Sequence, residues 1–275
     1  MIAGQPLKIN RLVPLCQSPV EYHYPFMARF ATRCQDGRMP GKQYDFSMGE
    51  ITTRAKLAIR GLGYSWGVAE DVGWAIGWLE QRDFPGLTLL ASLCQHIDER
   101  FAQVTETTSI ETGLRPQALS ATWTASEGQL CPILSGLALS DGGIPESHQG
   151  GLTLQNVMYP VLILPFVAVL AQTSNVLVEC RFGDLQAITD GEHLWIAPSP
   201  LTDRNSLSIS AHDVFIAISP ESQRPSFEPW PNHRSRASVT SSIWSILDQF
   251  AHRTYAPATE QSRILGAGAG VNDND

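Results

Sequence analysis

The chain has 275 residues, of which 43% are hydrophobic and 17% charged, and its formal net charge is −8. Disorder throughout is excluded, because disordered chains combine low hydrophobicity with high charge, and the length suits one large domain or two small ones. Residues 1–60 hold nine Lys and Arg against four Asp and Glu, whereas residues 61–275 hold ten against twenty-three. A predominantly acidic body disfavours binding to the phosphate backbone of nucleic acids.

A helical unit is predicted over residues 45–105, after a basic, proline-punctuated arm of residues 1–44. Its first helix begins at Ser47, because Ser47 and Glu50 have the spacing of a capping box. An apolar stripe at helical spacing then continues to Gly61 and Gly63, two glycines able to terminate that helix.

Two more helices are predicted in this unit, over residues 66–81 and about 85–102. Small residues recur every four positions in the earlier one, which predicts close approach of another backbone; they are Ala69, Gly73 and Gly77. Each glycine costs about 1 kcal/mol relative to alanine in a helix, so tertiary packing must offset the loss.

The remaining residues, 106–275, are predicted to form an α+β unit that is integrated with the helices into one domain from residue 45 onward. Residues 130–139 are a short β-prone run and residues 140–143 a turn. The apolar segment 157–171 is predicted to be a buried strand or a helix broken by its prolines.

Four short strands are then predicted as an antiparallel meander, followed by a last helix. The strands cover residues 176–181, 185–189, 193–197 and 214–219, and the helix covers residues 239–255. The order of helices, strands and a final helix predicts an α+β fold: a three-helix unit packed on a mainly antiparallel sheet, with a C-terminal helix and a glycine-rich tail.

The composition also excludes several chemistries. The five cysteines are scattered, without a Cys-x-x-Cys pair or a compact metal-ligand spacing, and no histidine pair has the spacing of a zinc motif. Lysine occurs three times, never in a Walker loop or in a context that favours a Schiff base. No cofactor and no structural metal are therefore expected, although Asp273 and Asp275 leave a hard cation as an alternative.

The compartment is predicted from the N-terminal residues and from the apolar segment. Residues 1–16 carry Lys8, Arg11 and two prolines, which is not typical of a secretory signal. The apolar segment 157–171 is shorter than the roughly 20 residues of a membrane-spanning helix. The sequence therefore predicts a cytoplasmic protein that does not bind membranes.

Two segments of the chain resemble a bacterial family known as domain of unknown function 3726. One runs from residue 47 to about 94 and centres on Gly-Leu-Gly-Tyr-Ser-Trp-Gly-Val-Ala-Glu (61–70), with the Trp-Leu-Glu and Phe-Pro-Gly that follow. The other contains Arg-Thr-Tyr-Ala-Pro-Ala-Thr-Glu (253–260), Ser-Arg (262–263) and the glycine-rich terminus. The resemblance implies a soluble bacterial protein but no reaction, and the arm of residues 1–44 looks like an addition to the family pattern.

Ser65 lies in a Gly-x-Ser-x-Gly pattern, residues 63–67, like that of a nucleophile elbow. That motif needs a strand before the serine, whereas a helix is predicted here, so we expect Ser65 to be the N-cap of the second helix. Glu70 follows on the same helix, and a role as general acid would require its burial.

The C-terminal tail, residues 266–275, fails as a dinucleotide fingerprint because no helix can follow its glycines. Two interpretations remain open: a mobile tail, or a strap that threads a pocket and delivers carboxylates. Arg253, Tyr255 and Arg263 could grip an anion or pair with acidic neighbours such as Glu260. The candidate ligand-binding residues are Ser65, Glu70, Arg253, Tyr255, Ser262, Arg263, Gly268, Asp273 and Asp275.

Three functions compete on these observations. The leading hypothesis is an enzyme that acts on a small polar or anionic metabolite, bound where the strap meets the turn of residues 65–70. The alternative is a non-catalytic accessory subunit of another enzyme, or a homo-oligomer, because the low charge content and the tryptophan-rich helix suit a protein–protein surface. DNA binding is the weakest hypothesis, because Glu70 and Asp71 stand where a recognition helix needs basic or amide side chains.

Overall fold

The computed structural model describes residues 42–101, 114–118, 121–126, 128–144, 150–197, 211–231 and 234–255. The expected arm of residues 1–44, apart from its last three residues, and the glycine-rich tail lie outside these ranges. The helices are α2 (Met48–Leu62), α3 (Trp66–Gln81), α4 (Gly86–Phe101), α6 (Pro132–Gly142), α7 (Leu164–Ser174) and α8 (Ser241–His252), with 3₁₀ turns η2 (Pro160–Ile163) and η4 (Glu221–Gln223). The strands are β1 (Gln43–Ser47), β2 (Gln117–Ala118), β3 (Thr122–Thr124), β4 (Leu152–Val157), β5 (Leu177–Phe182), β6 (Leu185–Thr189), β7 (Leu194–Ala197), β8 (His212–Ser219) and β9 (Arg236–Thr240).

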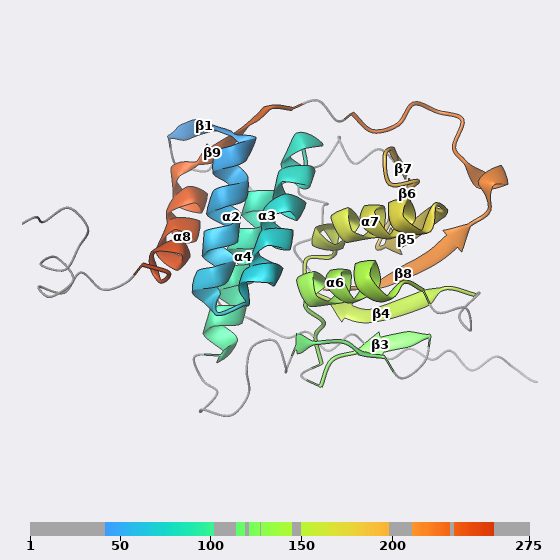
Figure 1. Cartoon of the computed structure of the whole chain (residues 1–275), viewed down its shortest axis with the longest axis horizontal. Coiled ribbons are helices and arrows are strands. Elements are labelled where there is room, and N and C mark those ends of the chain that lie inside the picture. The colour runs from blue at the N-terminus through green and yellow to red at the C-terminus, as the bar shows by residue number, and fades with distance from the viewer. Residues whose placement is uncertain are drawn as a thin grey trace, which may run out of the picture. The chain divides into compact units, whose positions relative to one another are not determined.

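The helices α2, α3, α4 and α8 pack side by side as one group (Figure 1). Strands β1 and β9 form a separate two-stranded antiparallel sheet beside them, in register from Gln43 opposite Thr240 to Ser47 opposite Arg236. Because β1 leads into α2 and β9 leads into α8, this pairing brings α8 back against α2. The C-terminal helix therefore completes the helical group and does not pack on the large sheet.

The local signals of the helical group are confirmed. Ser47 accepts a hydrogen bond from the backbone N–H of Glu50, whose side chain in turn accepts one from the backbone of Ser47, so the capping box is present. Helix α2 ends at Gly63, which has a positive φ of 111°. The small residues of α3 allow the close approach of another backbone, as predicted. A Cβ added at Gly73 would lie 2.8 Å from the carbonyl oxygen of Thr52 on α2.

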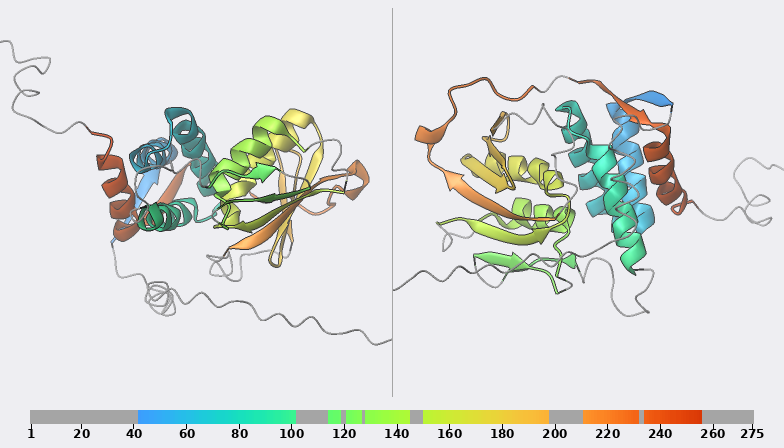
Figure 2. Two further views of the ribbon diagram at one scale, coloured as in Figure 1. Left: turned by 90° about the horizontal axis from the view of Figure 1, so that it is seen from below. Right: turned by 180° about the vertical axis from the view of Figure 1, so that it is seen from behind.

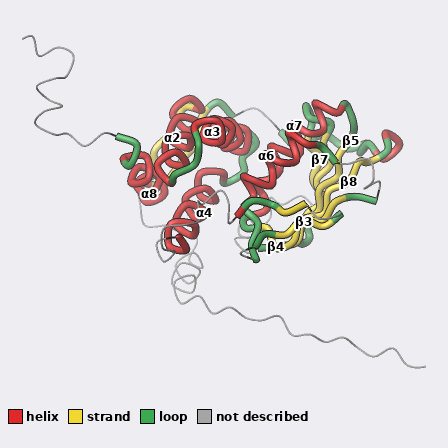
Figure 3. The backbone as a smooth tube through the Cα atoms, turned by 60° about the horizontal axis from the view of Figure 1, so that its bottom comes forward, coloured by secondary structure: helices red, strands yellow, loops and turns green. Residues whose placement is uncertain are grey.

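The large sheet has the order β2-β3-β4-β8-β5-β6-β7, and all its pairings are antiparallel except β3 with β4. Helices α6 and α7 lie together over one face of it (Figure 2, left; Figure 3). The predicted α+β class, with helices preceding a mainly antiparallel sheet, is confirmed. The meander is correct for β5, β6 and β7, but β8 pairs with β5 and β4 and not with β7.

The prediction of a β-prone run over residues 130–139 and a turn over 140–143 was wrong. Residues 132–142 form α6, and Pro132 stands in its first turn, where a missing N–H costs nothing. Residues 132–136 of α6 are buried in succession, as is Leu139, so its buried positions do not follow a clear helical period. A helix that is apolar on all sides lacks the periodicity by which helices are distinguished from buried strands.

Residues 157–171 contain a strand end, a 3₁₀ turn and most of an α-helix. Val157 ends β4, residues 160–163 form η2, and α7 begins at Leu164. Pro160 and Pro165 stand in the first turns of η2 and α7, so the prolines begin helices where we expected them to break one. In the part of the chain that the structure describes, no helix is long and apolar enough to cross a membrane.

Candidate functional site

Two of the predicted ligand-binding residues lie at the end of α8. Arg253 donates hydrogen bonds to both carboxylate oxygens of Asp98 on α4, at 2.6 and 2.9 Å. The bond from Arg253 lowers the pKa of Asp98, and the same bond raises the pKa of Arg253. Tyr255 is exposed, with its ring edge-on to that of His252. Arg253 is therefore already paired and is not available to an external anion without losing that pair.

The other predicted residues do not converge on Arg253 in the described chain. Ser65 is the N-cap of α3 and accepts a hydrogen bond from the backbone N–H of Val68. Glu70 is exposed on α3, with a carboxylate oxygen 3.8 Å from Nζ of Lys56. The remaining residues lie outside the described ranges: Ser262, Arg263, Gly268, Asp273 and Asp275.

The end of α3 and the turn that joins it to α4 carry buried charges that the sequence did not indicate. Glu80 and Arg82 are 8% and 4% exposed, although glutamate and arginine are rarely buried. Glu80 accepts a hydrogen bond of 2.8 Å from the backbone N–H of Leu87, at the start of α4. Asp83 holds a positive φ of 62° and forms an ion pair of 2.7 Å with Arg234. Two charges of this turn thus have defined partners.

Arg82 differs from its neighbours because its charge is not matched. Its Nη1 donates a weak hydrogen bond, 3.4 Å long, to the carbonyl oxygen of Trp78, and its guanidinium lies 3.9 Å from the centre of the Trp78 ring. Its Nε has no hydrogen-bond partner, and no carboxylate among the described residues forms an ion pair with it. Burial lowers the pKa of Arg82 to about 10, so the side chain stays positive at neutral pH.

Trp230 holds this turn against the large sheet. Its indole Nε1 donates to the carbonyl oxygen of Arg82 at 2.7 Å, and its backbone N–H donates to that of Leu194 on β7 at 2.6 Å. Its ring also lies against Phe84, with 5.8 Å between ring centroids. The backbone of Arg82 is therefore anchored on both the helical group and the sheet, which makes the turn a fixed platform.

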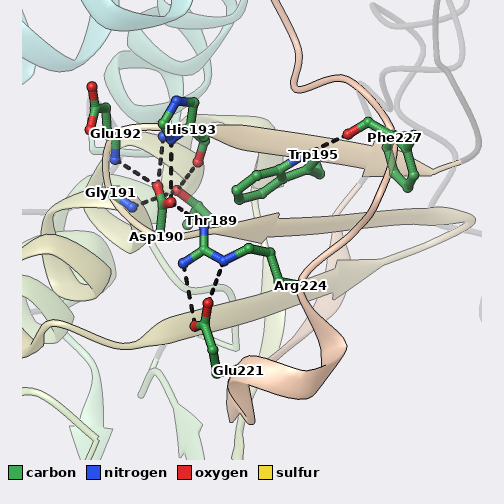
Figure 4. A network of polar contacts seen from close by, with 9 residues as sticks. All are labelled: Thr189, Asp190, Gly191, Glu192, His193, Trp195, Glu221, Arg224 and Phe227. Carbon is green, nitrogen blue, oxygen red and sulfur yellow. Dashed lines mark hydrogen bonds and ion pairs between the residues drawn. The ribbon is translucent and has the colours of Figure 1, made fainter.

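A polar network lies at the turn between β6 and β7, the strand that Trp230 also contacts (Figure 4). Asp190 accepts hydrogen bonds from the backbone of Glu192 and His193 and from Nη1 of Arg224 at 2.6 Å, and Arg224 also pairs with Glu221. Burial tends to raise the pKa of Asp190, but these hydrogen bonds outweigh it and lower the pKa. Hydrogen bonds to Glu221 and then Asp190 raise the pKa of Arg224.

These two clusters differ in what they can bind. In the network around Asp190, Arg224 is paired with the carboxylates of both Asp190 and Glu221. The hydrogen bonds that Asp190 accepts from the backbone close the β6–β7 hairpin. Arg82 keeps a buried Nε without a hydrogen-bond partner, and such an unused guanidinium donor suits binding of an anion. Among the described residues, no group of three or more His, Cys, Asp or Glu side chains could hold a metal ion.

The only sequence signal for this turn was the pair of motifs that flank Arg82, Trp-Leu-Glu at 78–80 and Phe-Pro-Gly at 84–86. Each motif has a defined structural part: Trp78 stacks on the guanidinium, Glu80 binds the start of α4, and Gly86 fits where a Cβ would lie 3.1 Å from that of Leu79. The motifs thus frame the buried arginine without identifying it.

Two dehydrogenases are among the solved structures to which this chain is weakly similar. A malate dehydrogenase from Entamoeba histolytica aligns with a TM-score of 0.49 and 9% identity, over 79% of this chain and 100% of that one. A dehydrogenase from Sinorhizobium meliloti aligns with a TM-score of 0.48 and 10% identity, over 76% of this chain and 100% of that one. Scores below 0.5 at such identities assign neither a fold nor an activity.

Sequence comparison is more specific over the helical group. No curated protein matches the chain significantly. Residues 46–122 match the family model described as "Protein of unknown function (DUF3726)", and this stretch contains α2, α3, α4 and the turn with Arg82. The match confirms the resemblance expected from the motifs, over the first of the two segments that carry it.

Proposed function

We propose that this protein is an enzyme that binds a small polar metabolite at the α3–α4 turn. The observation that supports the proposal is the burial of Arg82, 96% removed from solvent, without a carboxylate partner among the described residues. An uncompensated buried charge is costly, and a turn that served only to connect two helices could carry an apolar residue there. Strongly perturbed buried charges are concentrated at functional sites.

The surroundings of Arg82 also suit a binding site. The turn is held by Trp230 from one side and by the Asp83–Arg234 ion pair from another. Side chains whose supports are fixed in this way lose little conformational freedom when a ligand binds. The turn also lies within the family-matched residues 46–122.

A thermal-unfolding screen of neutral, cationic and anionic metabolites tests this proposal. We expect at least one to stabilise the wild type, by about 2.7 kcal/mol at a hundred times its Kd. Trp230→Phe removes the indole N–H that anchors Arg82 and should weaken the response, whereas Trp66→Phe, on an exposed part of α3, should not change it. If no metabolite stabilises the wild type, or if both variants respond as the wild type does, the proposal fails.

A second candidate function, an accessory subunit, is favoured by the exposed side of α3. Trp66 and Trp74 are 51% and 44% exposed on this helix, with the exposed Glu70 between them. A Cβ added at Gly67 would have no neighbour within 4 Å. Large exposed aromatic side chains gathered on one helix are typical of a protein–protein surface.

Affinity capture from the native host tests the accessory role. We expect a defined partner to be recovered with the wild-type chain and lost with the double variant Trp66→Ala, Trp74→Ala. Tyr255→Ala removes an equally exposed aromatic ring from the end of α8 and should retain the partner. Recovery of only the free chain, or an equal loss with both variants, would argue against this role.

A further inference from the structure

We infer that the Nε and Nη2 edge of Arg82 binds an oxyanion, either a carboxylate or a phosphate group of the ligand. The inference rests on the metabolite site proposed above and adds the chemical class of the group recognised. Its basis is the arrangement of donors around one buried guanidinium, together with the distribution of charge in the α3–α4 turn.

The guanidinium of Arg82 is used on one side only. Nη1 donates to the carbonyl oxygen of Trp78, while Nε has no partner and Nη2 makes no hydrogen bond to a described residue. The N–H groups of Nε and Nη2 are parallel and lie on the same edge of the planar group, which is the fork that carboxylates and phosphates engage with two hydrogen bonds. The unused donors are thus the pair best suited to an oxyanion.

The charges near this fork leave it positive. The carboxylate of Asp83 is paired with Arg234 at 2.7 Å, and that of Glu80 accepts from the N-terminus of α4, where the helix dipole favours a negative group. Neither carboxylate forms an ion pair with Arg82 in the described chain. An incoming anion would therefore meet a cation whose neighbours are already neutralised, in a place where low solvent content strengthens the attraction.

The fork is also held in a fixed orientation. The Cζ of Arg82 lies over the Trp78 ring, 3.9 Å from its centroid, and this cation–π contact helps to hold the guanidinium in place. The indole N–H of Trp230 donates a hydrogen bond of 2.7 Å to the backbone carbonyl oxygen of Arg82 and so fixes the backbone of that residue. A positioned fork binds a planar or tetrahedral oxyanion with little further ordering, whereas a lysine at this position would present a single mobile ammonium.

Titration of the full-length protein with sodium phosphate and, separately, with sodium succinate tests the inference, with ionic strength held constant by sodium chloride. We expect one of the two anions to bind the wild type saturably, as seen by calorimetry. Arg82→Lys should weaken that binding at least tenfold, and Arg82→Met should abolish it. Arg253→Met, which removes an arginine already paired with Asp98, should bind as the wild type does.

The unfolding midpoint in urea without added anion is the second measurement. Arg82→Met removes an unmatched buried charge, so its midpoint should equal or exceed that of the wild type, whereas Arg253→Met breaks an ion pair and should lower it slightly. Absence of saturable binding of both anions, equal binding by Arg82→Met, or a larger fall in its midpoint than in that of Arg253→Met would each overturn the inference. Metabolites that stabilise the wild type and Arg82→Met alike would leave the proposed site standing and remove only its anion specificity.

Discussion

The Gly61→Ala variant is expected to lower the free energy of unfolding by about 3 kcal/mol or more, because overpacking at a rigid contact cannot be relieved by a rotamer change. A Cβ added at Gly61 would overlap the carbonyl oxygen of Phe250 and lie 2.8 Å from its carbonyl carbon. Both atoms belong to the backbone of α8, so α8 itself would have to move away from α2. Urea denaturation followed by circular dichroism measures the change.

The matched control is Gly67→Ala, six residues farther along the same glycine-rich motif. A Cβ there would have no neighbour within 4 Å, and alanine favours a helix by up to about 1 kcal/mol relative to glycine. We therefore expect Gly67→Ala to be as stable as the wild type or slightly more so. Equal destabilisation by both substitutions would show that α8 does not pack against α2 as described.

The second large effect is expected for Gly191→Ala, in the turn between β6 and β7. Gly191 has a positive φ of 96°, which costs other residues about 1–2 kcal/mol, and its added Cβ would lie 2.7 Å from Cα and 2.8 Å from the backbone nitrogen of Gln172 on α7. The two penalties together should lower the free energy of unfolding by about 2–4 kcal/mol.

Gly183→Ala separates these two penalties. Gly183 also has a positive φ, of 52°, but the nearest atoms to an added Cβ are 3.8 Å away on His212. Only the conformational cost, about 1 kcal/mol, should remain. If both variants lost the same free energy in urea denaturation, the close contact between the β6–β7 turn and α7 would be contradicted.

The helical group was predictable because its signals are local. A capping box at Ser47, a serine cap at Ser65 and terminating glycines act over a few residues, and an apolar stripe on one side of α2 distinguishes it from a strand. These features do not depend on what the rest of the chain does. For the same reason the bounds of α3 agree with the predicted residues 66–81.

The parts that the sequence did not predict depend on distant contacts. Strand β1 was not predicted, and the boundary between the arm and the helical unit was placed inside it, because Gln43–Ser47 becomes a strand only through pairing with β9, near residue 240. Arg82 stands in a turn, where arginine is normally exposed, and part of its enclosure comes from Trp230, 148 positions later. No local pattern records such a contact, so a buried arginine could not be distinguished from a solvated one.

The return of α8 to α2 has a consequence for how the chain folds during synthesis. Arg54 on α2 forms an ion pair with Asp248 on α8, 194 positions away. The strands of the large sheet all lie in the sequence between α4 and α8, so the helical group is formed from residues on both sides of the sheet sequence. Contacts of such high sequence separation form slowly, and a nascent chain cannot make them before α8 leaves the ribosome. Helix α2, which has the strongest local helix signals, is therefore synthesised early, but its packing against α8 is among the last contacts to form.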